Sequence, residues 1–151
     1  MKNPIMNIES EIRNWLENRG YYYGHVYVID EVVAKCRPKI SSNDLEDFEK
    51  EFNHEPCLKG VSFDKCGEKW YKYEFKHDKL IELSSKLNAW SNENKFPISS
   101  SRIGFTLYIS AYEKLSDVQI KDLEKEFNVK YEEYSISCNS NDINYKFQWG
   151  Y

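Results

Sequence analysis

The chain repeats itself once, so any fold it adopts has to accommodate two copies of the same unit. Residues 41–53 and 116–128 align without a gap at an offset of 75 and share the ending Glu-Lys-Glu-Phe-Asn. The same offset pairs Trp15 with Trp90, together with aliphatic positions on either side. An offset that is kept through distant segments is typical of a duplicated structural unit. We therefore expect two pseudo-repeats within one domain that covers all 151 residues.

Each copy, about residues 5–76 and 80–150, is expected to begin with an amphipathic helix. In the first copy, Ile8, Ile12 and Trp15 recur at the spacing of one helix face. The second copy repeats this stripe with leucines and a tryptophan. A helix with one apolar face has to pack that face against another element.

A strand and a second helix follow in each copy. Residues 26–36 and 103–112 are rich in β-branched and aromatic side chains, which predicts one strand in each segment, long or interrupted. Ser41 then precedes the shared helix of the first copy, with Asp44 three residues later. The second copy has the same pattern from Ser116. A serine followed at this spacing by an acidic or amide residue is the sequence pattern of a helix start.

Each copy is predicted to end in a hairpin, over 58–75 and 129–149. The return strand of each hairpin alternates rings with polar residues, which indicates one buried and one solvated sheet face. These return strands align at an offset of 74, which pairs Tyr73 with Phe147. The whole unit is therefore predicted to be α-β-α-β-β.

Two such units give an α+β protein by tandem duplication. The middle of the chain then has the order β-α-β-β-α-β, which is the ferredoxin-like order. We expect a mostly antiparallel sheet with its helices on one face, because helices and sheets each bury one apolar side.

Three segments carry a resemblance to a known family. Residues 40–53, 70–75 and 115–128, with the order of the elements, resemble the ribonuclease E inhibitor RraB-like family of small α/β proteins. That resemblance implies a cytosolic, non-enzymatic protein that works by binding another protein.

Composition excludes several classes of protein. Lys plus Arg number 21 and Asp plus Glu 25, and the net charge of -4 has the wrong sign for a general binder of nucleic acid. No apolar stretch reaches the length of a membrane span or of a secretory signal. We therefore expect a cytoplasmic protein with no membrane partner, in which the four cysteines are thiols.

Catalytic and metal-binding patterns are weak. The closest is His54 with Cys57 and Cys66, and with Cys36 as a further thiol, residue types that zinc accepts. The spacing lacks a C-x-x-C pair, and no histidine accompanies a known catalytic motif. We expect no enzyme, no cofactor and no metal, and a small metal- or thiol-dependent hydrolase stays open as an alternative.

Two features predict a binding surface. Residues 41–56 carry a net charge of -5, whereas the matching 116–131 carry -1. We expect the acidic helix face and the tyrosine run that precedes the first strand to contact a partner. The residues concerned are Glu46, Asp47, Glu51, Glu55, Tyr21, Tyr22 and Tyr23.

The hypothesis that combines these features is a small immunity or inhibitor protein. It would neutralise a toxin or nuclease by occluding a basic active site, because acidic groups steer association with basic partners. An alternative is an inhibitor of a defence or RNA-processing system that uses its exposed sheet face, through Lys72, Lys146 and Gln148. Direct nucleic-acid binding is disfavoured because alternation places the rings and lysines of the return strands on opposite faces. The sequence leaves the oligomeric state and the copy that makes the contact open.

Overall fold

The computed structural model describes residues 3–150, and the chain divides into two compact units. The first unit comprises Ile5–Ile81, and the main part of the second begins at Glu82, close to the predicted boundary between the copies. The expectation that both copies belong to one domain stays a prediction.

The first unit contains two helices and a four-stranded sheet, with the elements α1 (Pro4–Asn18), β1 (Tyr22–Ile29), β2 (Glu31–Arg37), α2 (Ser42–Phe52), β3 (Cys57–Phe63) and β4 (Lys69–Phe75). The strand order is β1-β2-β4-β3, and every neighbouring pair is antiparallel. Helix α2 connects β2 to β3, and β4 lies between them in the sheet.

The second unit repeats this topology with α3 (Asp78–Glu93), β5 (Ile98–Ile103), β6 (Thr106–Ala111), α4 (Asp117–Phe127), β7 (Val129–Ile136) and β8 (Ile143–Trp149). The first turn of α3, as far as Ile81, belongs to the first unit. Its strand order, β5-β6-β8-β7, is the order of the first sheet, again antiparallel throughout. The shared topology agrees with the predicted duplication of an α+β unit.

The segment 26–36, predicted as one long or interrupted strand, is a hairpin, whereas the strand predicted over 103–112 is β6 and the further strand β5 precedes it. A hairpin therefore follows each opening helix. Asp30 turns the first one in a left-handed conformation at φ 63°, and β1 and β2 pair on either side of it. The unit is therefore α-β-β-α-β-β. The ferredoxin-like order is present along the chain from β2 to β5, but β5 belongs to the other sheet.

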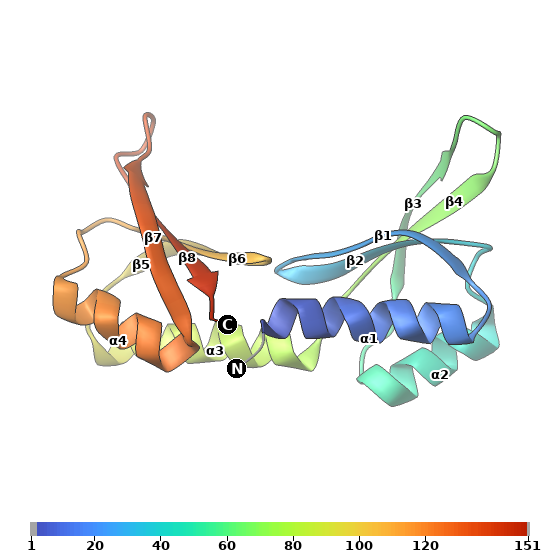
Figure 1. Cartoon of the computed structure of the whole chain (residues 1–151), viewed down its shortest axis with the longest axis horizontal. Helices are drawn as coiled ribbons and strands as arrows, with labels where there is room; N and C mark the ends of the chain where they lie inside the picture. The colour runs from blue at the N-terminus through green and yellow to red at the C-terminus, as the bar shows by residue number, and fades with distance from the viewer. Residues whose placement is uncertain (1–2, 151) are drawn as a thin grey trace. The chain divides into compact units, whose positions relative to one another are not determined.

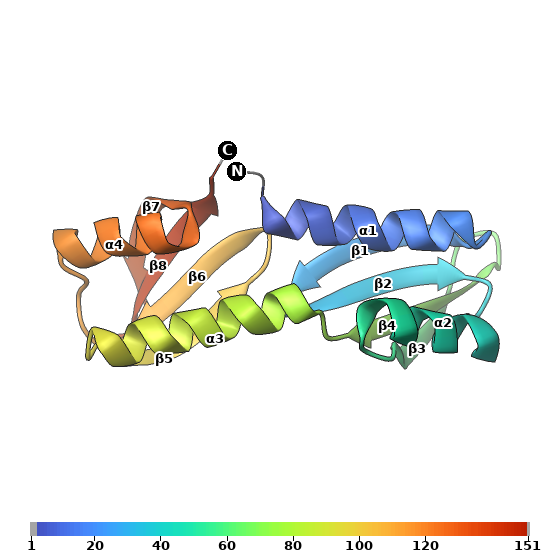
Figure 2. The ribbon, with the colours of Figure 1, turned by 90° about the horizontal axis from the view of Figure 1, so that it is seen from below.

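Both helices of each unit lie on the same side of its sheet (Figure 1). The view from the helix side shows α1 and α2 across the first sheet (Figure 2). The side chains that face the helices form the core of the first unit, and they include Val26, Val28, Val32, Ala34, Cys36, Tyr73 and Phe75. The prediction of helices on one face is confirmed. The opposite side of each sheet, which no described helix of its unit covers, is called the open face.

A buried tyrosine hydroxyl fixes the start of the second helix in each unit. The backbone N–H of Ile40 donates to Tyr73 Oη at 3.0 Å, and that of Leu115 donates to Tyr145 Oη at 2.7 Å. The strand registers agree, since Ala34 pairs with Tyr73 as Ile109 pairs with Tyr145. Each bond joins a core strand to the residue before a helix N-cap.

This pairing corrects the predicted alignment of the return strands. Tyr73 corresponds to Tyr145 and not to Phe147, so the offset of 74 is wrong by two residues. A shift of two keeps each side chain on the same face of the sheet, and therefore the alternation of rings and polar residues could not reveal it.

We predict that Tyr73→Phe and Tyr145→Phe each lower the free energy of unfolding by about 1 to 2 kcal/mol, because each leaves a buried N–H without its acceptor. Denaturant titration measures the loss, and hydrogen exchange at Ile40 or Leu115 locates it. Tyr71→Phe is the matched control, because Tyr71 lies two residues away on the same strand. An equal loss from this control would contradict the strand register that pairs Ala34 with Tyr73.

Candidate functional site

The candidate site lies in the first unit, where the end of α1 meets the start of α2. Gly20, at φ 81°, ends α1 in a Schellman motif, with Tyr21 N–H donating to Leu16 O at 2.9 Å. The second unit ends α3 in the same way, with Lys95 in the left-handed position. The motif turns the chain sharply, and Arg19 and Tyr21 thereby reach α2.

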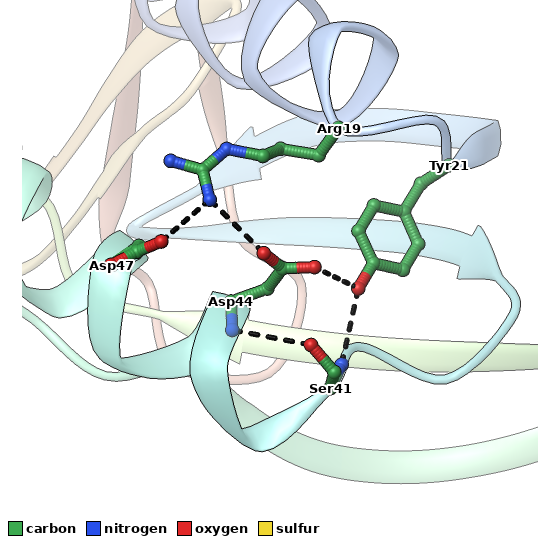
Figure 3. Close-up of polar contacts among 5 residues, drawn as sticks. All are labelled: Arg19, Tyr21, Ser41, Asp44 and Asp47. Atoms are coloured by element: carbon green, nitrogen blue, oxygen red, sulfur yellow. Dashed lines mark hydrogen bonds and ion pairs between the residues drawn. The ribbon is translucent and has the colours of Figure 1, made fainter.

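Five residues form a closed polar network here (Figure 3). Arg19 Nη1 donates to Asp44 Oδ1 at 3.0 Å and to Asp47 Oδ2 at 2.7 Å. Tyr21 Oη donates to Asp44 Oδ2 at 2.5 Å and accepts from Ser41 N–H at 3.1 Å. The Tyr21 hydrogen bond, with that of Arg19, lowers the pKa of Asp44, and burial with the Asp44 contact raises the pKa of Tyr21.

The network explains why the predicted capping interaction differs between the copies. In the second unit, Ser116 and Gln119 form the full reciprocal box, with Ser116 N–H donating to Gln119 Oε1 at 2.9 Å. In the first unit, Ser41 Oγ accepts from Asp44 N–H, but Ser41 N–H donates to Tyr21. Tyr21 Oη therefore accepts the hydrogen bond that a capping-box side chain would accept, and it donates its own proton to the Asp44 carboxylate.

The three tyrosines have three different environments. Tyr21 is 8% exposed, and its hydroxyl is used inside the network, so it is not the surface anchor that we expected. Tyr22 is 64% exposed on the open face, and Tyr23 is half-buried. The burial of Tyr21 follows from its position at the helix end, where it stacks beside Trp15 with ring centroids 6.3 Å apart.

The four predicted acidic contacts also separate into two kinds. Asp47 is held by Arg19, which offsets part of the acidic charge. Glu46, Glu51 and Glu55 are exposed, and within residues 3–150 none of them forms an ion pair. Arg19 could not be predicted as a site residue from the sequence, because it lies 28 positions from Asp47 and the corresponding residue of the second copy is Asn94.

Comparison of the copies shows what Arg19 changes. In the second unit, Trp90 Nε1 donates to Asp122 Oδ2 at 2.8 Å. Trp15 and Asp47 occupy the matching positions, but Trp15 Nε1 is buried and has no hydrogen-bond partner in the described part of the chain. Arg19 binds Asp47 and lies 5.1 Å from the centroid of the Trp15 ring. Arg19 therefore binds the carboxylate of Asp47, whereas the matching carboxylate of Asp122 accepts from the Trp90 indole in the second copy.

Beside this network, α1 and α2 border a pocket of about 630 Å³. Its apolar lining is Trp15 and Phe52, and its polar lining is Glu11, Asn14, Asn18, Arg19, Glu51, His77 and Asp78. Asp78 accepts from Asn53 Nδ2 at 2.8 Å and lies 2.6 Å from His54 Nε2, and these contacts lower its pKa. His77 Nε2 is 3.5 Å from Glu11 Oε2. The pocket thus combines two apolar aromatic rings and three carboxylates with the Arg19 guanidinium and the His77 imidazole.

The residues considered for metal or thiol chemistry lie apart. His54 contacts Asp78, whereas Cys57 and Cys66 are exposed free thiols. Burial raises the pKa of the Cys36 thiol to about 12, which leaves it protonated at neutral pH. Among residues 3–150, no group of three metal-ligating side chains forms. The geometry of these residues therefore gives the hydrolase alternative no assembled site.

The open face of the first sheet carries a feature that the alternation argument missed. Tyr73 and Phe75 face the helices as predicted, but Trp70 is on the opposite face of the same strand. The Arg37 guanidinium lies 4.8 Å from the Tyr22 ring centroid and 5.3 Å from that of Trp70. Rings and basic side chains therefore share this face, contrary to our expectation for the return strands.

No protein-family model, curated protein or solved structure matches this chain. Within the described part of the chain, no helix has the length and apolar character needed to cross a membrane. A function is accordingly inferred from the geometry of the two units.

We predict that Arg19→Asn, which reproduces the second copy, releases Asp47 to accept from Trp15 Nε1. The new hydrogen bond should move the Trp15 indole proton resonance downfield and slow its exchange about tenfold, the effect of one buried hydrogen bond. Nuclear magnetic resonance of the labelled protein measures both. The Trp90 indole is the internal control, and an unchanged Trp15 signal would contradict the proposed competition.

Proposed function

We propose that this protein is a non-enzymatic cytoplasmic binding protein that neutralises a basic partner, as an immunity or inhibitor protein does for a toxin or nuclease. The observation that carries the proposal is the exposed acidic charge of α2 and of the segment directly after it, beside a carboxylate-lined pocket. Glu46, Glu51 and Glu55 have no ion pair among residues 3–150, and Glu51 also lines the pocket.

The second copy supports an external role for Glu46 and Glu55, because Lys121 and Lys130 occupy the matching positions, whereas Glu51 is matched by Glu126. Its helix α4 has the same apolar spacing and also begins after a capping serine, Ser116, with a net charge of -1 in the matching segment. The unit can therefore form this helix without the additional acids.

The mechanism would be electrostatic steering followed by occlusion. A carboxylate surface raises the rate at which a basic partner is captured, and the effect weakens as salt is added. Tyr22 does not belong to this surface, because it lies on the open face while α2 covers the other side of the sheet. The resemblance of the sequence to RraB-like inhibitors is in keeping with a protein that acts by binding.

We predict that the triple variant Glu46→Lys, Glu51→Lys, Glu55→Lys loses its partner. Capture from lysate of the source cells, with mass spectrometry, should return a basic protein with the wild type but not with the variant. Association of the purified pair should slow about tenfold at low salt and lose its salt dependence.

The matched control makes the same charge change in the second unit, at Glu93, Glu113 and Glu133, which are exposed. This control should bind within about twofold of wild type, since charges outside the contact act only through the screened long-range field. Equal capture by all three proteins, or capture of acidic proteins only, would contradict the proposal.

The ring and arginine stack favours a second candidate surface, the open face of the first sheet. Arg37 is held between Tyr22 and Trp70 and pairs with Glu68 at 3.0 Å, and its Nε is buried without a hydrogen-bond partner among the described residues. Tyr, Trp and Arg are the residue types that dominate protein interfaces. An inhibitor of a defence or RNA-processing system could use this face, with Lys72 nearby on the same strand as Trp70.

In the second unit, the residues named for this alternative are already engaged. Gln148 Nε2 donates to Glu132 Oε2 at 2.6 Å, and Lys146 Nζ lies 3.5 Å from Glu132 Oε1. Tyr22→Ala in the capture experiment separates the two surfaces. If Tyr22→Ala loses the partner and the acidic triple variant keeps it, the partner binds at the open face.

A further inference from the structure

The second unit contains a cation at the position that corresponds to the pocket of the first unit. Lys86 Nζ lies 5.1 Å from the centroid of the Phe127 ring. It also lies 2.5 Å from the backbone oxygen of Glu126 and 3.9 Å from Glu126 Oε1. The ammonium group thus rests on a ring at the carboxyl end of α4, where the helix dipole favours positive charge.

The first unit keeps the ring and the helix end that contact this lysine, but it lacks the lysine itself. At the offset of 75, Glu51 and Phe52 match Glu126 and Phe127, whereas Glu11 takes the place of Lys86. Glu51 and Phe52 both line the pocket at the carboxyl end of α2, and Glu11 faces them from α1. A carboxylate therefore replaces an ammonium beside the same ring and the same helix end.

Further groups in the pocket increase its preference for a cation. Asp78 adds a carboxylate, and Trp15 adds a second ring. Arg19 is already bound by Asp44 and Asp47, and its position over Trp15 shows that this ring accepts a guanidinium. His77 Nδ1 accepts from Lys79 N–H at 3.1 Å, so the ring is anchored to the chain at the wall of the pocket.

We infer that the pocket of the first unit binds the ammonium or guanidinium group of a lysine or arginine side chain supplied by the basic partner. Glu11 and Glu51 neutralise the charge, Asp78 contributes from the rim, and Phe52 and Trp15 contact the aliphatic stem. The volume of about 630 Å³ suits a long side chain better than a bare ion. This inference rests on the proposed function, since it names the chemistry of the partner at that surface.

The test titrates the full chain, labelled with nitrogen-15, with N-acetyl-lysine methylamide. N-acetyl-norleucine methylamide, which has a similar stem and no charge, is the control probe. We expect saturable shifts of the Trp15 indole and the Asn18 amide, with Kd on the order of millimolar for a single cationic group, and no saturation with norleucine.

Variants make the test specific to the pocket. Glu11→Lys restores the residue of the second copy, and its own ammonium should occupy the pocket and weaken probe binding at least tenfold. Glu51→Gln removes one carboxylate and should weaken it severalfold. Glu113→Lys makes the same charge change as Glu11→Lys at an exposed position of the second unit, and should leave Kd within about twofold.

The results separate this inference from the proposed function. Shifts that stay linear, that match those with norleucine, or that persist in Glu11→Lys would overturn the inference. A partner captured through Glu46 and Glu55 by a protein that fails to bind the probe would leave the proposed function standing. Probe binding that saturates in wild type and is lost in Glu11→Lys supports the inference even where the capture experiment fails.

Discussion

One-sided burial governs the structure of each unit. An antiparallel sheet can keep one face in water while the other packs on helices. A unit of about 75 residues has little interior, so the rings that face α1 and α2, such as Tyr73 and Phe75, make up much of it. Two surfaces are left to diverge without loss of the core, namely the outer side of the helices and the open face of the sheet. Both candidate interaction surfaces lie there.

Sequence patterns predicted the parts of the fold that depend on local chemistry. The repeat, the opening helices, the caps at Ser41 and Ser116, and burial of one sheet face all follow from residue spacing. The hairpin turn at Asp30 was missed because aspartate seldom adopts the left-handed conformation, and the segment reads as one β-rich run. The alignment of the return strands was predicted wrongly because a slip of two residues leaves every side chain on the same face of the sheet.

The candidate site was predictable only in part, for a related reason. Charge density along α2 is visible in the sequence, and it identified Glu46 and Glu51 as exposed acids. Their neighbours come from elsewhere in the chain. Arg19 reaches α2 through the turn at Gly20, and Asp78 enters the pocket from the start of α3. These groups come together only in the folded chain, and no periodic pattern in the sequence indicates such contacts between distant segments.

The two copies have the same topology but differ in the charged side chains at matching helix positions. In the second unit, Lys86 lies at the carboxyl end of α4, and Asp122 accepts a hydrogen bond from the Trp90 indole. The first unit has Glu11 and Arg19 at positions where the second has Lys86 and Asn94. Each exchange removes an interaction that the second unit keeps, while Trp15 and Phe48 stay buried in the first copy as Trp90 and Leu123 do in the second.

The Trp15 indole indicates that these differences lower the stability of the first unit. A buried N–H without an acceptor costs about 1 to 3 kcal/mol relative to one that is bonded, as in the second unit. The Arg19 interaction with Asp44 and Asp47 is solvent-exposed and screened, so it returns less than a buried hydrogen bond would. The first unit is therefore expected to be the less stable of the two. This cost falls at helix positions that border the candidate pocket, where Trp15 and Arg19 are both part of the lining.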